Sequence, residues 1–214
     1  MAGLSASNLS DVRQLVKDWA DRSDISDSVI DNFINIAGQR ANRELEISPL
    51  ESSATLPFTN NTLPIPSDYA RAKQLKVEVG GRVVTLERKP IFEVEELSAA
   101  SYSGIPCFFS EKEGVFIVAP SPNGIEEATL NYYIEVDTLV NDTDTNWLVT
   151  DGTTALLYGA LKELNVYVSD EETAATYQGQ FVSAVDEIQT YYDESESSGS
   201  TLSVNNSTTY TKYG

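Results

Sequence analysis

The sequence contains no histidine and few basic residues. Its 214 residues include 14 Lys and Arg against 33 Asp and Glu, which gives a formal net charge of −19. Without histidine the commonest general base is missing, and Ser-His-Asp triads, Cys-His dyads and ordinary zinc sites are excluded. The shortage of Lys and Arg argues against nucleic-acid binding and against attachment to anionic lipid, because both require clustered positive charge.

Cysteine is also scarce. The single cysteine, Cys107, rules out a disulfide within the chain and fits a reducing compartment such as the cytoplasm. It lies between Pro106 and Phe108 in an apolar run, so we expect a small buried core residue rather than a reactive thiol. No apolar run approaches the roughly 20 residues that span a bilayer, and the N-terminus lacks the pattern of a secretory signal.

Apolar residues recur at helical spacing near both ends of the chain. We expect Asn8 or Ser10 to cap the first helix. Ser169 followed by Glu172 has the pattern of a capping box before the last helix. Four main helices are predicted, at about residues 8–22, 28–45 and 151–168, and from the capping box to about 194.

The middle of the chain has strand patterns. AKQLKVEV and RVVTLERK flank the two glycines at 80–81, and two apolar runs flank residues 111–114, so two hairpins are predicted. A hairpin turn is also plausible at Asn60-Asn61, although prolines in its flanking segments favour edge strands. Pro90 lies near the start of a short helix or helical turn.

Two adjacent tyrosines, Tyr132 and Tyr133, lie in one of the predicted strands. Successive strand residues point to opposite faces of a sheet. Either both rings are half-buried sheet residues, or one reaches a surface that binds another subunit or a sugar.

Together these elements predict an α+β protein. Helical pairs from both ends form a four-helix bundle, with an antiparallel β-domain inserted between its halves and an extended C-terminal tail. The expected divisions are an N-terminal helical hairpin at 1–50, the inserted β-domain at 51–145, a C-terminal helical hairpin at 146–192 and the tail at 193–214.

Motifs for catalysis or metal binding are few. The NDTDTN run at residues 141–146 resembles a calcium loop, but it lacks the glycine at the sixth position and the later glutamate. Glycine-rich phosphate loops and the G-x-S-x-G motif do not occur. A hydrolase that uses only carboxylates stays open, and would need two carboxylates converging in a pocket. We expect no enzyme activity, no cofactor and no metal.

Three stretches, taken in order, resemble one known family. LPIPSDYARAKQLKV is similar to a segment that precedes a β-hairpin in phage adaptor proteins, and GIPCFFSEKEGVFIVAPSPNG is similar to a hairpin of that family. The chain from ATLNYYIEV through NWLV to the last helix resembles the family's C-terminal half. The sequence is therefore similar to the head-to-tail adaptors of short-tailed bacteriophages, also called tail tubular protein A or gatekeeper, mainly over residues 63–192.

The resemblance implies a structural virion protein. Such adaptors form a ring of twelve on the portal, continue the DNA channel and carry the tail nozzle. The implied partners are the portal protein, the nozzle protein and tail fibres. Assembly would occur in the host cytoplasm, and double-stranded DNA would pass during genome ejection without specific binding, which the acidic charge favours. The alternative is a carbohydrate- or protein-binding tail or neck module without ring assembly.

The last 22 residues, DESESSGSTLSVNNSTTYTKYG, are polar but keep a few apolar side chains. Fully extended, they would reach about 70 Å. Given the resemblance, we predict that this tail adds as a strand to the portal, where backbone hydrogen bonds give affinity. Without the resemblance we would interpret it as a flexible terminus. The side chains predicted to fill portal pockets are Leu202, Val204, Tyr210 and Tyr213.

Overall fold

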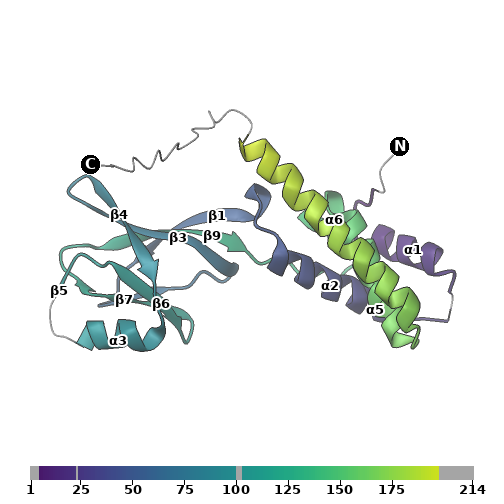
Figure 1. Cartoon of the computed structure of the whole chain (residues 1–214), viewed down its shortest axis with the longest axis horizontal. Helices are drawn as coiled ribbons and strands as arrows, with labels where there is room; N and C mark the ends of the chain where they lie inside the picture. The colour runs from purple at the N-terminus through teal and green to yellow at the C-terminus, as the bar shows by residue number, and fades with distance from the viewer. Residues whose placement is uncertain (1–4, 23, 100–102, 198–214) are drawn as a thin grey trace, which may run out of the picture.

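The computed structural model describes residues 5–22, 24–99 and 103–197. The molecule is elongated, with most helices at one end and the strands at the other (Figure 1). The helices are α1 (Leu9–Ala20), α2 (Asp27–Glu44), α3 (Ile91–Ala99), α4 (Trp147–Thr150), α5 (Thr153–Tyr167) and α6 (Glu171–Ser197), with a 3-10 turn at Ser48–Leu50. The strands are β1 (Glu51–Pro57), β2 (Thr62–Pro64), β3 (Tyr69–Val79), β4 (Arg82–Arg88), β5 (Ser103–Gly104), β6 (Phe108–Lys112), β7 (Val115–Ala119), β8 (Ser121–Pro122) and β9 (Glu127–Ile134).

Helix α5 is the centre of the helical part, which comprises α1, α2 and α4–α6. It packs against α1, α2 and α6, and its buried residues share one hydrophobic cluster with theirs. Helices from both ends of the chain therefore share a core, as predicted. The regular four-helix bundle is not confirmed, because these contacts are centred on α5. Among the helices of the described residues, none is long and apolar enough to cross a membrane.

Seven strands form one mostly antiparallel sheet in the order β1-β9-β3-β4-β6-β7-β2. The proline-containing strands β1 and β2 are its two edges, as predicted. A connection of four residues, 58–61, joins these edges, and Thr59 bridges Thr62. Because so short a connection links opposite edges, the sheet curls until it is nearly closed. Its interior is filled by a second hydrophobic cluster that includes Leu75, Phe116 and Leu130.

Both predicted hairpins are present. β3 pairs with β4 across Gly80 and Gly81, and β6 pairs with β7 across Glu113 and Gly114. All four turn residues have positive φ angles, which suits two-residue turns between twisted strands. The turn at Asn60-Asn61 is present as well, because Thr59 and Thr62 exchange two backbone hydrogen bonds at 2.9 and 3.1 Å across it. Beyond this one pair the segments separate, and β1 pairs with β9 while β2 pairs with β7.

Asn8 caps α1, as one of the two predicted alternatives: its side chain accepts a hydrogen bond from the Asp11 N–H. The predicted capping box of α6 is wrong. Ser169 has a φ of 62° and ends α5 in a left-handed conformation. The cap therefore moves one residue along the chain, and the Asp170 carboxylate accepts from the Thr173 N–H at 3.1 Å.

The expectation of a buried Cys107 is also wrong, because its thiol is exposed. The backbone N–H of Cys107 donates to Ala119 and its carbonyl accepts from Glu87. These two bonds fix the residue at the entry to β6 and turn its side chain away from the core, whereas Phe109 two residues later is buried. The apolar run that contains Cys107 is therefore not buried along its whole length.

Gly159 sets how closely α2, α5 and α6 pack. A Cβ at this position would lie 2.6 Å from the Ala37 Cβ and 3.0 Å from the Phe181 Cδ2. Replacement of Gly159 by alanine therefore forces two helices apart, and this cost exceeds the helix-propensity gain of about 1 kcal/mol.

We expect Gly159→Ala to lower the free energy of unfolding by about 1 to 3 kcal/mol. Gly179→Ala is the matched control, because Gly179 lies in α6 and a Cβ there meets nothing within 4 Å. That variant should be as stable as the wild type or more stable. Urea unfolding of the three proteins measures the difference, and a stabilised Gly159→Ala variant would contradict the packing described.

Candidate functional site

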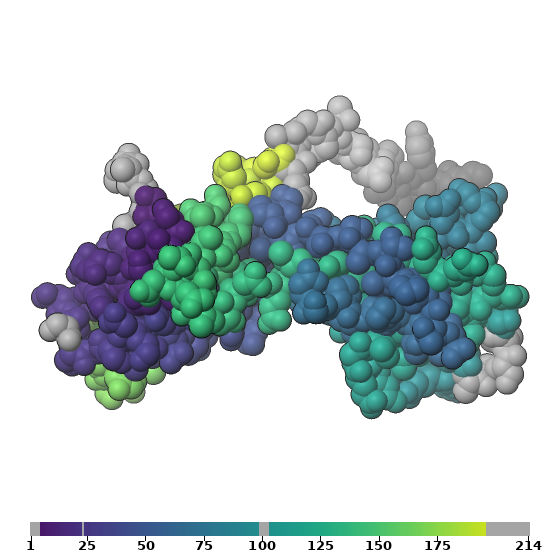
Figure 2. Space-filling view, turned by 180° about the vertical axis from the view of Figure 1, so that it is seen from behind, coloured from purple at the N-terminus to yellow at the C-terminus, as the bar shows by residue number. Residues whose placement is uncertain are grey.

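Two linkers cross between the helical part and the sheet part, which comprises β1–β9 and α3. Residues 45–50 lead from α2 to β1, and residues 135–146 lead from β9 to α4. In the space-filling view the helical part, in purple and green, meets the blue and teal sheet part along a neck (Figure 2). We call this region the junction. It is the candidate functional site, because its geometry sets the orientation of the two parts.

Side-chain amides of α2 hold the second linker. Asn35 donates to the Leu139 carbonyl and accepts from the Leu139 N–H, both at 2.9 Å. Asn42 donates to the Ile134 carbonyl at 3.1 Å and accepts from the Val136 N–H at 3.2 Å. An amide carries one donor and one acceptor side, so each asparagine satisfies the linker backbone as a neighbouring strand would. The linker is therefore fixed along α2.

The first linker is held from the opposite side. Gln189 of α6 accepts from the Glu46 N–H at 2.8 Å and donates to the Glu46 carbonyl at 3.2 Å. Arg71 of β3 donates to the carbonyls of Arg43 and Leu45 at 3.2 and 3.1 Å. One helix and one strand thus hold the chain where it leaves α2.

The two tyrosines at the end of β9 join the two cores. Tyr132 belongs to the cluster inside the sheet, and Tyr133 belongs to the helical cluster. Both are buried, with exposed fractions of 4% and 6%. The suggestion that one of them reaches a surface is therefore wrong, because each face of β9 is covered by a different core. The guanidinium of Arg71 lies 5.1 Å from the centre of the Tyr133 ring.

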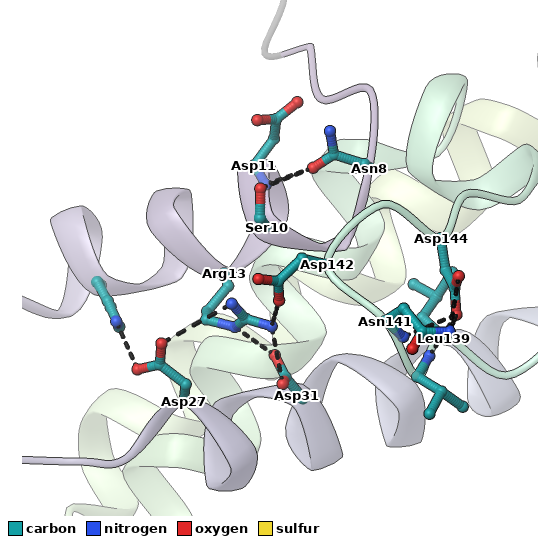
Figure 3. Close-up of polar contacts among 12 residues, drawn as sticks. Asn8, Ser10, Asp11, Arg13, Asp27, Asp31, Leu139, Asn141, Asp142 and Asp144 are labelled. Carbon is teal, nitrogen blue, oxygen red and sulfur yellow. Dashed lines mark hydrogen bonds and ion pairs between the residues drawn. The ribbon is translucent and has the colours of Figure 1, made fainter.

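Arg13 connects α1, α2 and the second linker (Figure 3). Its side chain is buried and binds both carboxylate oxygens of Asp31 at 2.6 and 2.9 Å. It also donates to Asp142 of the linker at 2.8 Å. The hydrogen bonds to Asp31 raise the pKa of the guanidinium more than its burial lowers it. Asp27 lies farther away, at 3.8 Å, so three carboxylates compensate the permanent charge of Arg13.

The linker also caps α1. The carbonyl of Asp144 accepts from the Leu9 N–H at 2.9 Å, and the carbonyl of Asp142 accepts from the Ser10 N–H at 3.1 Å. The first amides of a helix have no partner within the helix. The linker supplies two of these partners, so α1 and residues 142–144 stabilise each other.

The NDTDTN run thus has a structural role. The Asp144 carboxylate accepts from the N–H groups of Asn141 and Val140, both at 2.8 Å, and these bonds lower its pKa. Across the described residues, no group of three His, Cys, Asp or Glu side chains is placed to hold a metal ion. The sequence pattern of this run did not predict its contacts with α1.

A hollow of about 390 Å³ opens beside the junction, and we call it the junction hollow. Glu111 in its wall accepts from the Tyr69 O–H at 2.5 Å and pairs with Arg88 at 3.0 Å. Two effects raise the pKa of Tyr69: its burial, which is the larger, and its hydrogen bond to Glu111. The residues that line it are Gln39, Asn42, Arg43, Tyr69, Ala70, Arg71, Arg88, Glu111, Glu135 and Val136.

A second hollow, of about 400 Å³, lies between α4 and α6 and is lined by Trp147, Tyr191 and Tyr192 among others. We call it the aromatic hollow. The Tyr191 ring is 68% exposed. Helix α6 continues to Ser197, so residues 193–197 of the expected tail are helical. The predicted portal-binding residues Leu202, Val204, Tyr210 and Tyr213 lie outside the described residues.

We expect Arg13→Gln to lower the free energy of unfolding by about 2 to 4 kcal/mol, because it leaves Asp31 without its charged partner. Arg22→Gln is the control: Arg22 pairs with Asp24 at the surface, where ion pairs contribute little. Chemical unfolding of both variants measures the difference. Equal stability of the two would mean that Arg13 does not hold the linker.

Comparison with known proteins identifies a family whose model includes both parts of the fold. The model of the SU10 adaptor protein family matches residues 7–205, which include both parts of the fold and both linkers. No curated protein matches the chain. The family match confirms the resemblance to phage adaptors, while the short-tailed subtype stays a prediction. The chain belongs to the SU10 adaptor protein family.

Proposed function

We propose that the chain forms the head-to-tail adaptor ring of a short-tailed bacteriophage, which connects the portal to the tail nozzle and continues the DNA channel. The observation that carries this proposal is the family match over residues 7–205. The family points to a structural protein of the virion rather than an enzyme. The ring of twelve, its partners and assembly in the host cytoplasm are part of the proposal.

The distribution of charge supports a channel that does not hold DNA. Of the 14 Lys and Arg, Lys212 lies outside the described residues. Ten of the other thirteen form ion pairs with Asp or Glu. Their charge is compensated within the chain, so little positive charge is left for phosphates, and net repulsion lets DNA pass.

The hydrogen-bonded junction is consistent with a ring component whose two domains keep a fixed orientation. We propose that the chain comprises a helical domain from residues 1–50 and 146–192, an inserted β-domain from residues 51–145, and a tail. Inter-domain motion is the default where few contacts cross a boundary. Here both linkers are hydrogen-bonded to helices, and the first is also bonded to β3, so one domain can be placed on the portal while the other is held at a fixed angle.

Three aromatic side chains, of which Tyr191 is exposed and Trp147 and Tyr192 are half-buried, support contacts with other proteins. Tyr and Trp are enriched at the centres of protein interfaces, and Trp147, Tyr191 and Tyr192 surround the aromatic hollow. We propose this hollow as a contact surface for a neck or tail component. The same hollow favours the second candidate function, a carbohydrate- or protein-binding module, because aromatic rings beside Asp151 and Glu187 also suit a sugar.

The tail is proposed to dock on the portal. Twelve tails on one ring act together, so each individual contact can be weak. We expect the full chain to load about twelve copies onto a portal ring from the same phage, and a chain that ends at Ser197 to fail. This truncation retains every residue of α6. Native mass spectrometry of each mixture counts the copies.

A full-length variant separates the apolar side chains from tail length. Leu202→Ser, Val204→Ser, Tyr210→Ser and Tyr213→Ser together should abolish loading, whereas Ser203→Ala with Thr209→Ala should not. If the wild-type chain stays monomeric beside an intact portal, the adaptor proposal fails and the binding module replaces it. If the truncated chain loads normally, only the docking of the tail is wrong.

A further inference from the structure

The junction hollow gathers positive charge on an otherwise acidic chain. Arg43, Arg71 and Arg88 line it, from α2, β3 and β4, in a protein whose formal net charge is −19. Two carboxylates, Glu111 and Glu135, lie in the same wall. The lining therefore has a formal charge of +1, opposite in sign to the chain as a whole.

Hydrogen-bond donors exceed acceptors in this hollow. The described contacts of Arg88 use Glu111, and Glu111 also accepts from Tyr69. Arg71 uses two backbone carbonyls and Glu46 at 3.3 Å, and its Nε is buried without an acceptor. Three guanidinium groups thus share the wall of the hollow, and the carboxylate of Glu111 in that wall already has two partners.

Arg43 is the donor that stays available. It is exposed at the end of α2, and it forms no side-chain hydrogen bond or ion pair within the part of the chain that the structure describes. Lys76 and Arg82 likewise form no ion pair with any described residue, but they do not line the hollow. Arg43 alone of these three stands beside two further arginines.

We propose that the junction hollow is a carboxylate-binding site, and that an Asp or Glu side chain of a second copy of this chain fills it. This inference rests on the proposed function, because it concerns neighbouring copies in a ring. Guanidinium groups bind carboxylates with two parallel hydrogen bonds. The hollow of about 390 Å³ is large enough for a carboxylate side chain, and Arg43 provides the free donors.

Charge explains why a second copy is the occupant. Neighbours in a ring contact each other through two different surfaces. Chains of net charge −19 repel each other unless a positive surface on one meets a negative surface on the next. Ten of the thirteen described basic side chains are paired internally, Arg71 and Arg88 among them. Of the three others, Arg43 is the one that lines a hollow with further arginines. The junction hollow is the place where several guanidinium groups occur together.

The test compares Arg43→Glu with Arg82→Glu in the full chain. Arg82 is exposed at the β3–β4 turn and, like Arg43, forms no ion pair with the described residues. Both variants replace an arginine by a glutamate, so they change the net charge equally. Each protein is mixed at increasing concentration with portal rings of the same phage, and native mass spectrometry records the copies per portal. Unfolding curves verify that all three proteins are folded.

We expect the wild type and Arg82→Glu to load cooperatively, with full rings beside empty portals. Arg43→Glu should give partly filled rings and should need about tenfold more protein for half loading, because neighbours no longer attract each other. Arg43→Gln should show the same defect in weaker form. Its loading should also depend less on salt than that of the wild type, because a charge pair has been removed.

Three results would overturn the inference. Cooperative loading of Arg43→Glu at the wild-type concentration would exclude a role for the hollow between copies. An equal defect in Arg82→Glu would show a general effect of charge. Non-cooperative loading of the wild type would place Arg43 against the portal rather than a second copy. Failure of the wild type to load at all would instead defeat the proposed function, and this inference with it.

Discussion

The orientation of the two parts depends on how the linker backbones satisfy their hydrogen bonds. A chain that leaves a helix or a sheet loses its regular partners, and buried polar groups without partners are costly. Asn35 and Asn42 supply those partners with their side-chain amides, and Gln189 adds two hydrogen bonds at the surface. Because each amide both donates and accepts, its two hydrogen bonds stabilise the linker and also define its position. The junction is therefore held by directional bonds in addition to apolar contact.

Electrostatics acts on the same region in two ways. Arg13 is bound by carboxylates from α2 and from the linker, so its charge ties three segments of the chain together. Among residues 5–22, 24–99 and 103–197 Arg43 has no such partner, which leaves its charge available to another molecule. Most basic side chains of the described residues are paired with a carboxylate, as Arg13 is, and are not left unpaired like Arg43. In the proposed ring, an acidic protein whose cations are mostly paired internally would suit a channel wall, and its few unpaired cations would be left for contacts between subunits.

Regular elements could be predicted from the sequence because their signals are local. Helical periodicity located α1, α2, α5 and α6, and paired turn residues located both hairpins. The junction could not be predicted, because its bonds join residues that are 26 to 143 positions apart in the sequence. One signal was present in the sequence: Asn35 and Asn42 lie seven residues apart, beside the apolar stripe of α2. In the structure Asn42 is buried. Cys107 and the cap of α6 were missed because a strand entry and a left-handed residue shifted the local pattern.

A direct test of the rigid junction is the distance between two spin labels in the free chain. Cys107 is exposed and is the one cysteine of the sequence, so it takes a label in the sheet part without further change. Gln180→Cys on an exposed position of α6 takes the second label. A junction held by the amide side chains predicts a single narrow distance distribution by pulsed electron resonance. A broad or two-peaked distribution would contradict a fixed orientation of the two parts.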